Sequence, residues 1–93
     1  MEVRWQKRAV SDLYRVCEYI RRDNPSAAEM AGAAIETATR NLARYPEMGR
    51  AGEVPGTREL IVNGLPYLVV YRVQGQAVQI LRVLHGKQQW PSS

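Results

Sequence analysis

The chain is poor in the residues that form disulfides or bind metals, with one cysteine and one histidine among its 93 residues. A single cysteine cannot form a disulfide within the chain, and the position of Cys17 in an amphipathic pattern predicts a structural thiol. No histidine or cysteine pair stands at ligand spacing, and no glycine-rich loop follows a predicted strand. We therefore expect neither a metal site nor a nucleotide cofactor.

Long apolar runs are also missing. No stretch approaches the roughly 18 residues that a membrane-spanning helix needs. The first ten residues, MEVRWQKRAV, lack the apolar region of a signal peptide. These absences predict a cytoplasmic protein without a membrane partner.

The composition is that of a folded protein, with 45% apolar and 24% charged residues. A chain of 93 residues has room for one core, so we expect a single domain over residues 1–93. The net charge is +4, and residues 50–93 hold five Lys or Arg against two Asp or Glu. This cationic second half predicts an acidic partner, either nucleic acid or an acidic protein segment.

Helical periodicity extends over residues 7–45 and predicts a helical hairpin. The first helix has an apolar stripe, with Asp12 among the charged residues expected around the rest of its circumference. Pro25 separates the two helices. The second helix begins either at a capping box over residues 26–29 or with Asn24 as its cap. The stripe of the first helix consists of Ala9, Leu13, Val16 and Ile20.

Three runs of β-branched and aromatic residues follow a loop that is rich in glycine and proline. Turn signals at Asn63-Gly64 and Gln74-Gly75-Gln76 predict hairpins between them, and residues 2–5 form a candidate additional strand. We expect an α+β fold in which the N-terminal helical hairpin packs on a small antiparallel β-sheet. The three runs cover residues 58–62, 67–73 and 77–84.

Both faces of this sheet are predicted to be apolar, because apolar residues occupy successive positions of the strands. A helical hairpin covers one face, so the other must be closed by the C-terminal tail, by self-association or by another protein. We interpret the second face as a binding surface for a partner segment. The candidates for it are Leu68, Val70, Val78, Ile80 and Leu84.

Cationic and aromatic residues also gather near the end of the predicted sheet. Arginine and lysine bind phosphates through charge-assisted hydrogen bonds and tryptophan stacks on bases, so the set favours a nucleic-acid or target-binding site. A structural interpretation is also open, in which the arginines cap the sheet and the histidine satisfies a backbone carbonyl. The candidates are Arg50, Arg58, Arg72, Arg82, His85, Lys87 and Trp90.

Segments spread over nearly the whole chain share the pattern of one protein family. They are Pro46, Gly49-Arg50, GTRELIV at 56–62, PYLVVYRV at 66–73, ILRVLHG at 80–86 and Trp90-Pro91. In these segments the chain resembles the RelE/ParE superfamily, the toxins of bacterial type II toxin–antitoxin modules. The sequences YRV and RVLHG are the most specific part of the resemblance.

The resemblance implies a growth-inhibiting toxin that a cognate antitoxin neutralises in a hetero-oligomer, by a partly disordered segment that folds on binding. The antitoxin would then be the partner of the second apolar face. Superfamily members divide between binding of DNA gyrase and ribosome-dependent cleavage of mRNA. Leu68 stands where RelE-like nucleases commonly have an arginine, and no carboxylate or terminal tyrosine completes a catalytic set, so ParE-like gyrase binding is preferred. The catalytic candidates of the alternative, a nuclease, are Arg58, Arg72, Arg82 and His85.

Overall fold

The computed structural model describes residues 1–88 and 90 and shows the predicted α+β fold, two helices followed by most of a five-stranded sheet. The elements are β1 (Glu2–Trp5), α1 (Lys7–Arg21), α2 (Pro25–Asn41), β2 (Arg50–Ala51), β3 (Arg58–Ile61), β4 (Tyr67–Gln74) and β5 (Ala77–His85). No helix in this part of the chain is both long and apolar enough to cross a membrane. Pro91, part of the resemblance, lies outside the described residues.

The helical hairpin is confirmed; its second helix starts at one of the two predicted caps and ends earlier than expected. Asn24 caps α2, because its Oδ1 accepts a hydrogen bond of 3.1 Å from the N–H of Ala27. Pro25 occupies the first helical position, where its missing N–H costs nothing. The alternative capping box at residues 26–29 lies inside the helix and does not form its start.

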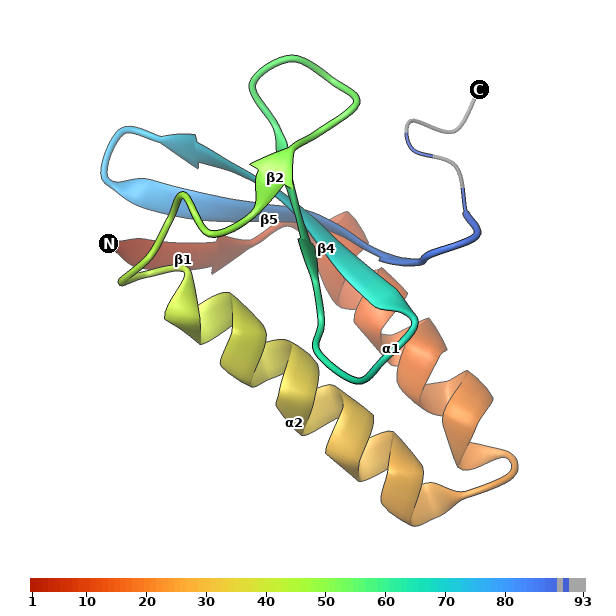
Figure 1. The fold of residues 1–93 in the computed structure, drawn as a ribbon. Helices are drawn as coiled ribbons and strands as arrows, with labels where there is room; N and C mark the ends of the chain where they lie inside the picture. The colour runs from red at the N-terminus through yellow and green to blue at the C-terminus, as the bar shows by residue number, and fades with distance from the viewer. Residues whose placement is uncertain (89, 91–93) are drawn as a thin grey trace.

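The sheet has the order β1-β5-β4-β3-β2. Its predicted hairpins are antiparallel, whereas β1 pairs in parallel with β5, so the complete sheet is mixed. The first and last strands of the chain therefore lie side by side (Figure 1). The sequence did not predict β2, which has only two residues and pairs with the start of β3.

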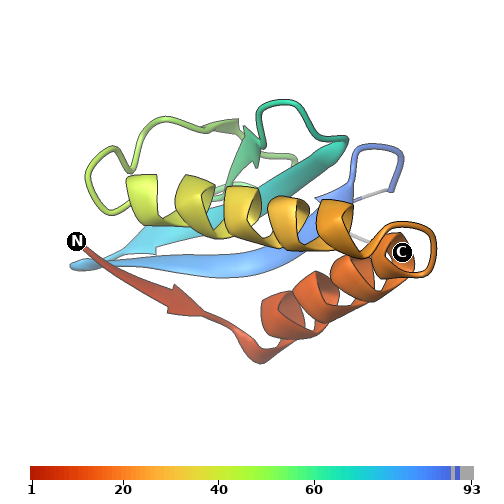
Figure 2. The same cartoon turned by 90° about the horizontal axis from the view of Figure 1, so that it is seen from below.

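Both helices cover one face of the sheet and enclose the core (Figure 2). Tyr71 is the largest side chain that is fully buried, and Ile35 of α2 and Leu42, which directly follows α2, are equally inaccessible to solvent. The core consists of Ala9, Ile35, Leu42, Val62, Val69, Tyr71, Val78, Ile80 and Val83.

A β-bulge in β5 changes which residues share a face. Val70 pairs with Arg82 but Tyr71 pairs with Ile80, so Leu81 is an extra residue without a partner in β4. Because the bulge interrupts the alternation, Ile80 and Val83 both face the helices. The expectation that Val78 and Ile80 share an open face with Leu84 was therefore wrong, since those two residues lie in the core.

The face away from the helices is also less open than the sequence indicated. Val70 is 0% exposed and Leu84 is 2% exposed within the single chain. Two charged residues, Glu59 and Arg82, lie among these apolar residues and are themselves buried. The chain thus covers much of this face with its own residues, and the prediction of an uncovered apolar surface there was wrong.

Candidate functional site

The outer face of the sheet, turned away from the helices, carries two rows of side chains that cross three strands. Cross-strand pairing places Ile61, Leu68 and Leu84 in one row, and Glu59, Val70 and Arg82 in the next. A pocket of about 500 Å³ lies beside them. It is lined by Arg50, Glu53, Glu59, Leu68, Leu84, Gly86, Gln88 and Trp90.

Arg82 of the outer face is bound by a carboxylate from α1. Its Nε lies 2.7 Å from Asp12 Oδ2, and its Nη2 lies 3.1 Å from Oδ1, so the pair is bidentate. Asp12 also accepts a hydrogen bond of 3.0 Å from the N–H of Val83, at the edge of β5 beyond the end of β1. Both side chains are at most 10% exposed. The Arg82 guanidinium is therefore held in place by the fold.

Trp90 lies against the same guanidinium. The Cζ atom of Arg82 is 5.9 Å from the centroid of the Trp90 ring, within the range of a cation–π contact. Asp12 and Trp90 thus contact the same side chain from two segments of the chain, and Trp90 lines the pocket of the outer face.

The second buried charge of the outer face, Glu59, is also paired. Arg50 Nη2 donates to Glu59 Oε1 at 3.2 Å, and the N–H of Glu53 donates to Oε2 at 3.3 Å. Arg50 keeps 61% of its side chain exposed, so it remains available to a partner at the rim.

Arg58 lies on the helix side of the sheet and binds the segment that follows α2. Its Nη1 donates to the carbonyl oxygen of Gly49 at 2.7 Å. Tyr71 binds the same segment, because its hydroxyl donates to Pro46 O at 2.7 Å and accepts from Gly49 N at 2.8 Å. A Cβ atom at Gly49 would lie 2.7 Å from the Tyr71 ring, so this approach requires glycine.

Burial raises the pKa of the Tyr71 phenol from its ordinary value of 10.0, and the Gly49 N–H opposes the shift only in part. A folded-state pKa above the unfolded value means that the neutral phenol stabilises the fold fully below pH 10, and that this stability is lost as the pH rises through the folded pKa. We expect Tyr71→Phe to lower the free energy of unfolding at pH 7 by about 1–3 kcal/mol, because the buried Gly49 N–H loses its acceptor.

The difference in the free energy of unfolding between wild type and Tyr71→Phe should become smaller above pH 10, because the wild-type protein must then ionise a buried phenol. Urea denaturation measured from pH 7 to pH 11 tests this, with Tyr19→Phe as the control because Tyr19 is 69% exposed. Parallel pH profiles for wild type and Tyr71→Phe would contradict it.

His85 makes two structural contacts through its ring. Its Nδ1 accepts a hydrogen bond of 3.1 Å from the N–H of Lys87, which caps the turn after β5. The imidazole lies edge-on to Tyr67, with 5.5 Å between the ring centroids. The sequence-based alternative of a contact to a backbone carbonyl was wrong in detail, since the ring accepts from an N–H.

The four catalytic candidates do not converge. Arg58 and His85 pair across the strands with Tyr71 and Tyr67 on the helix side, whereas Arg72 and Arg82 belong to the outer face. Arg72 lies five residues along β4 from the partner of His85, or about 17 Å away. Its Nε donates to Gln79 Oε1 at 2.8 Å.

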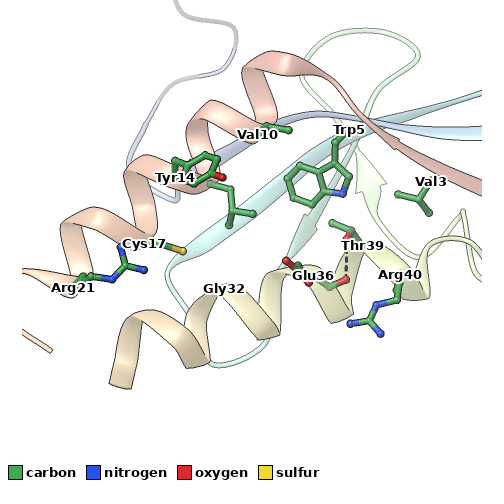
Figure 3. Close-up of a pocket in the computed structure, with 11 residues that line it drawn as sticks. Val3, Trp5, Val10, Tyr14, Cys17, Arg21, Gly32, Glu36, Thr39 and Arg40 are labelled. Carbon is green, nitrogen blue, oxygen red and sulfur yellow. Dashed lines mark hydrogen bonds between the residues drawn. The ribbon is translucent and has the colours of Figure 1, made fainter. Parts of the chain in front are cut away.

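A separate groove lies on the helical side, between β1, α1 and α2 (Figure 3). The groove has a volume of about 590 Å³. Within it, Trp5 lies between the two helices. The helices approach each other at Gly32, where an added Cβ would lie 3.4 Å from Cys17 Sγ. The groove is lined by Val3, Trp5, Val10, Leu13, Tyr14, Cys17, Arg21, Gly32, Glu36, Thr39 and Arg40.

Comparison with known proteins identifies the chain's relatives. Residues 3–90 match the family model described as the ParE toxin of the type II toxin–antitoxin system parDE. The chain belongs to the ParE toxin family. This confirms the resemblance to the RelE/ParE superfamily that the sequence indicated.

Individual relatives of this ParE-family chain cover nearly its whole length. It is 44% identical to the putative toxin Y4kP of Sinorhizobium fredii, over 96% of this chain and 92% of that protein. It is 38% identical to toxin RelE2 of Caulobacter vibrioides, over 91% and 94% of the two chains.

Two solved structures share the fold. The chromosomal ParDE system from P. aeruginosa contains a chain with a TM-score of 0.84 at 30% identity, covering 91% of this chain and 95% of that one. The RelBE2 toxin–antitoxin complex from Mycobacterium tuberculosis has a TM-score of 0.63 at 27% identity, covering 90% and 88%.

Sequence reasoning missed Asp12 and the groove of this ParE-family toxin. Asp12 was expected among the charged residues around the rest of the first helix, and no signal in the sequence marked it as the partner of Arg82, 70 residues away. The groove gave no signal either, because it depends on the angle at which the helices diverge.

Proposed function

We propose that this ParE-family toxin inhibits growth by binding DNA gyrase, without cutting nucleic acid. The observation that carries the proposal is the separation of its cationic candidates. RNA cleavage needs a base for the 2′-hydroxyl, cations for the phosphorane and an acid for the leaving oxygen, all around one phosphate. Arg82 is engaged by Asp12, Arg58 by backbone carbonyls and His85 by the Lys87 N–H, on two faces of the sheet.

Binding makes smaller demands, because an exposed cationic rim is enough to attract and orient an acidic surface. Arg50, Arg72 and Lys87 are exposed and can each contact such a surface. They remain our candidates for contact with the target, together with Trp90.

Expression of the toxin without an antitoxin tests the proposal. We expect growth arrest with inhibited supercoiling by purified gyrase, and with mRNA whose ends are unchanged within translated codons. His85→Ala should remain toxic, because the ring caps a turn in this proposal and transfers no proton, and circular dichroism should confirm that the variant is folded.

One observation favours a second candidate, ribosome-dependent cleavage of mRNA: the relatives named RelE2 and RelE1 match at 38% and 32% identity. This alternative predicts cuts within translated codons, intact supercoiling and loss of toxicity in His85→Ala. Those three results together would replace gyrase binding with nuclease activity.

We further propose that a cognate antitoxin neutralises the toxin by placing an apolar segment in the groove between β1, α1 and α2. The structure neighbours are toxin–antitoxin systems, which supports an antitoxin as the partner. The groove is the larger of the two pockets described above, and its floor includes the partly buried side chains of Val3, Trp5 and Leu13. By contrast, charged residues interrupt the outer face.

The rim of the groove indicates which segment would fit. Arg21 of α1 and Arg40 of α2 line the groove, and Glu36 of α2 lies between them (Figure 3). A helix with an apolar stripe flanked by acidic residues would place its apolar face on Trp5 and its carboxylates near the arginines. Acidic antitoxin residues are thus expected beside the apolar ones.

Cys17 provides a direct probe of this groove, since it lines the groove and is the only cysteine of the chain. Burial raises the pKa of its thiol, so alkylation by a maleimide should be slow at pH 7 and faster as the pH rises. We expect a cognate antitoxin to slow this alkylation at least about tenfold, because a bound segment would cover the sulfur atom.

Two valines give a matched pair of control variants. Val10 lines the groove and is 39% exposed, whereas Val73 lies outside its lining and is 40% exposed. Val10→Asp should abolish the protection and Val73→Asp should preserve it. Equal protection in both variants would place the antitoxin elsewhere.

A further inference from the structure

The strand β1 forms an open edge of the sheet. It pairs with β5 on one side only, through hydrogen bonds that include Glu2 N to Gln76 O at 3.2 Å and Gln6 N to Ile80 O at 2.9 Å. Even-numbered residues therefore direct their backbone groups towards β5. The N–H and C=O groups of Val3 and Trp5 point away from the sheet, where they can pair with another strand.

This edge has only part of the usual protection against strand pairing. Natural edge strands are protected by shortness, charged side chains, bulges or proline. β1 is short and carries Glu2 and Arg4, but it has no proline and stays in continuous register with β5. The opposite edge, β2, has only two residues. Within the described part of the chain, β1 is thus the longer edge of the sheet.

The charges of β1 are complementary to a second copy of the same strand. Glu2 and Arg4 lie on the outer face, with side chains 61% and 60% exposed, and pair within the chain at 3.1 Å. In an antiparallel pair with a two-fold axis at Val3, Val3 faces Val3 of the second copy and the two residues exchange both backbone hydrogen bonds. The same register places Glu2 directly opposite Arg4 of the second copy, on both sides of the axis.

We propose that two copies of the free toxin associate through antiparallel pairing of their β1 strands. The two sheets then form one continuous sheet, with both helical layers on the same face. Four residues from each chain make a small interface, so the dimer is weak and depends on concentration. The side chains of Val3 and Trp5 also line the groove proposed for the antitoxin, whereas the dimer uses the backbone edge of the strand. The readout is the molecular mass of the free toxin, which depends on neither the target nor the antitoxin.

Charge reversal at two positions tests the pairing. Sedimentation velocity over a range of concentrations should show a monomer–dimer equilibrium for the wild-type protein. Glu2→Arg and Arg4→Glu each place like charges opposite one another in the dimer, so each variant alone should dimerise at least about tenfold more weakly.

Mixing the two variants distinguishes contact between chains from contact within a chain. In a heterodimer of Glu2→Arg with Arg4→Glu, every opposed pair again has opposite charges, so dimerisation should return. The ion pair within each chain remains broken in both variants, so recovery on mixing cannot arise from it.

A backbone variant provides an independent test. Val3→Pro removes an N–H that points away from β5 and should abolish the dimer while leaving the circular dichroism spectrum unchanged. A wild-type protein that is monomeric at every concentration, or a mixture that does not dimerise, would overturn the proposal.

Discussion

Asp12→Ala is expected to lower the free energy of unfolding by about 3–5 kcal/mol, because it leaves the charge of Arg82 buried without a partner. Arg82 is 8% exposed, so its guanidinium cannot recover the lost contact from water without a change in the fold. The N–H of Val83 loses its acceptor in the same variant. Small domains have a total stability of about 5–15 kcal/mol, so the variant should be close to unfolding at 37 °C.

Three further variants separate the causes of this loss. Asp12→Asn keeps an acceptor for Val83 but loses the charge, so its stability should be intermediate. Asp12→Leu combined with Arg82→Leu removes both charges and should recover much of the loss. Glu18→Ala breaks the exposed pair with Arg21 and should cost less than 1 kcal/mol in urea denaturation. If Asp12→Ala costs no more than Glu18→Ala, Arg82 does not depend on this carboxylate.

Leu42→Ala should lower the free energy of unfolding by about 2–5 kcal/mol through the cavity that it leaves. Leu42 is 0% exposed and stands at the C-terminal end of α2, in the same core cluster as Tyr71 and Val69. The range is wide because the cost depends on how far the neighbouring segment relaxes into the cavity. Urea denaturation followed by circular dichroism measures it directly.

Two controls define this effect. Leu42→Met nearly conserves volume and should cost less than about 1.5 kcal/mol. Met30→Ala removes a similar volume from α2 where the side chain is 72% exposed, so its effect should be small. A Leu42→Ala protein as stable as Met30→Ala would show that the end of α2 does not contribute to the core.

Local sequence signals predicted the elements of the fold well. Helical periodicity and Pro25 located both helices, and runs of β-branched residues located β3, β4 and β5. The two-residue strand β2 is too short to give a periodic signal, and its pairing with β3 depends on the loop between them. Parallel pairing of β1 was not predictable, because it requires contact between residues at opposite ends of the sequence.

The sites were harder to predict than the elements. The bulge at Leu81 consists of one apolar residue among other apolar residues, and no residue type distinguishes it in the sequence. It nevertheless decides that Ile80 is in the core and that Leu84 is on the outer face.

The charged residues of that face were predicted to bind phosphate, but their partners, Asp12 for Arg82 and Glu59 for Arg50, lie in other elements. Such pairs become visible only once the chain is folded.

The pairing of β1 with β5 also constrains when the chain can acquire its final shape. Val3 has no strand partner until Val78 has been synthesised, and Asp12 has no arginine to bind until residue 82 is present. Contacts over such sequence separations close late and slow folding. During translation the nascent polypeptide therefore lacks both contacts until residues 78–82 have been synthesised, so the toxin cannot take up its folded conformation before that point.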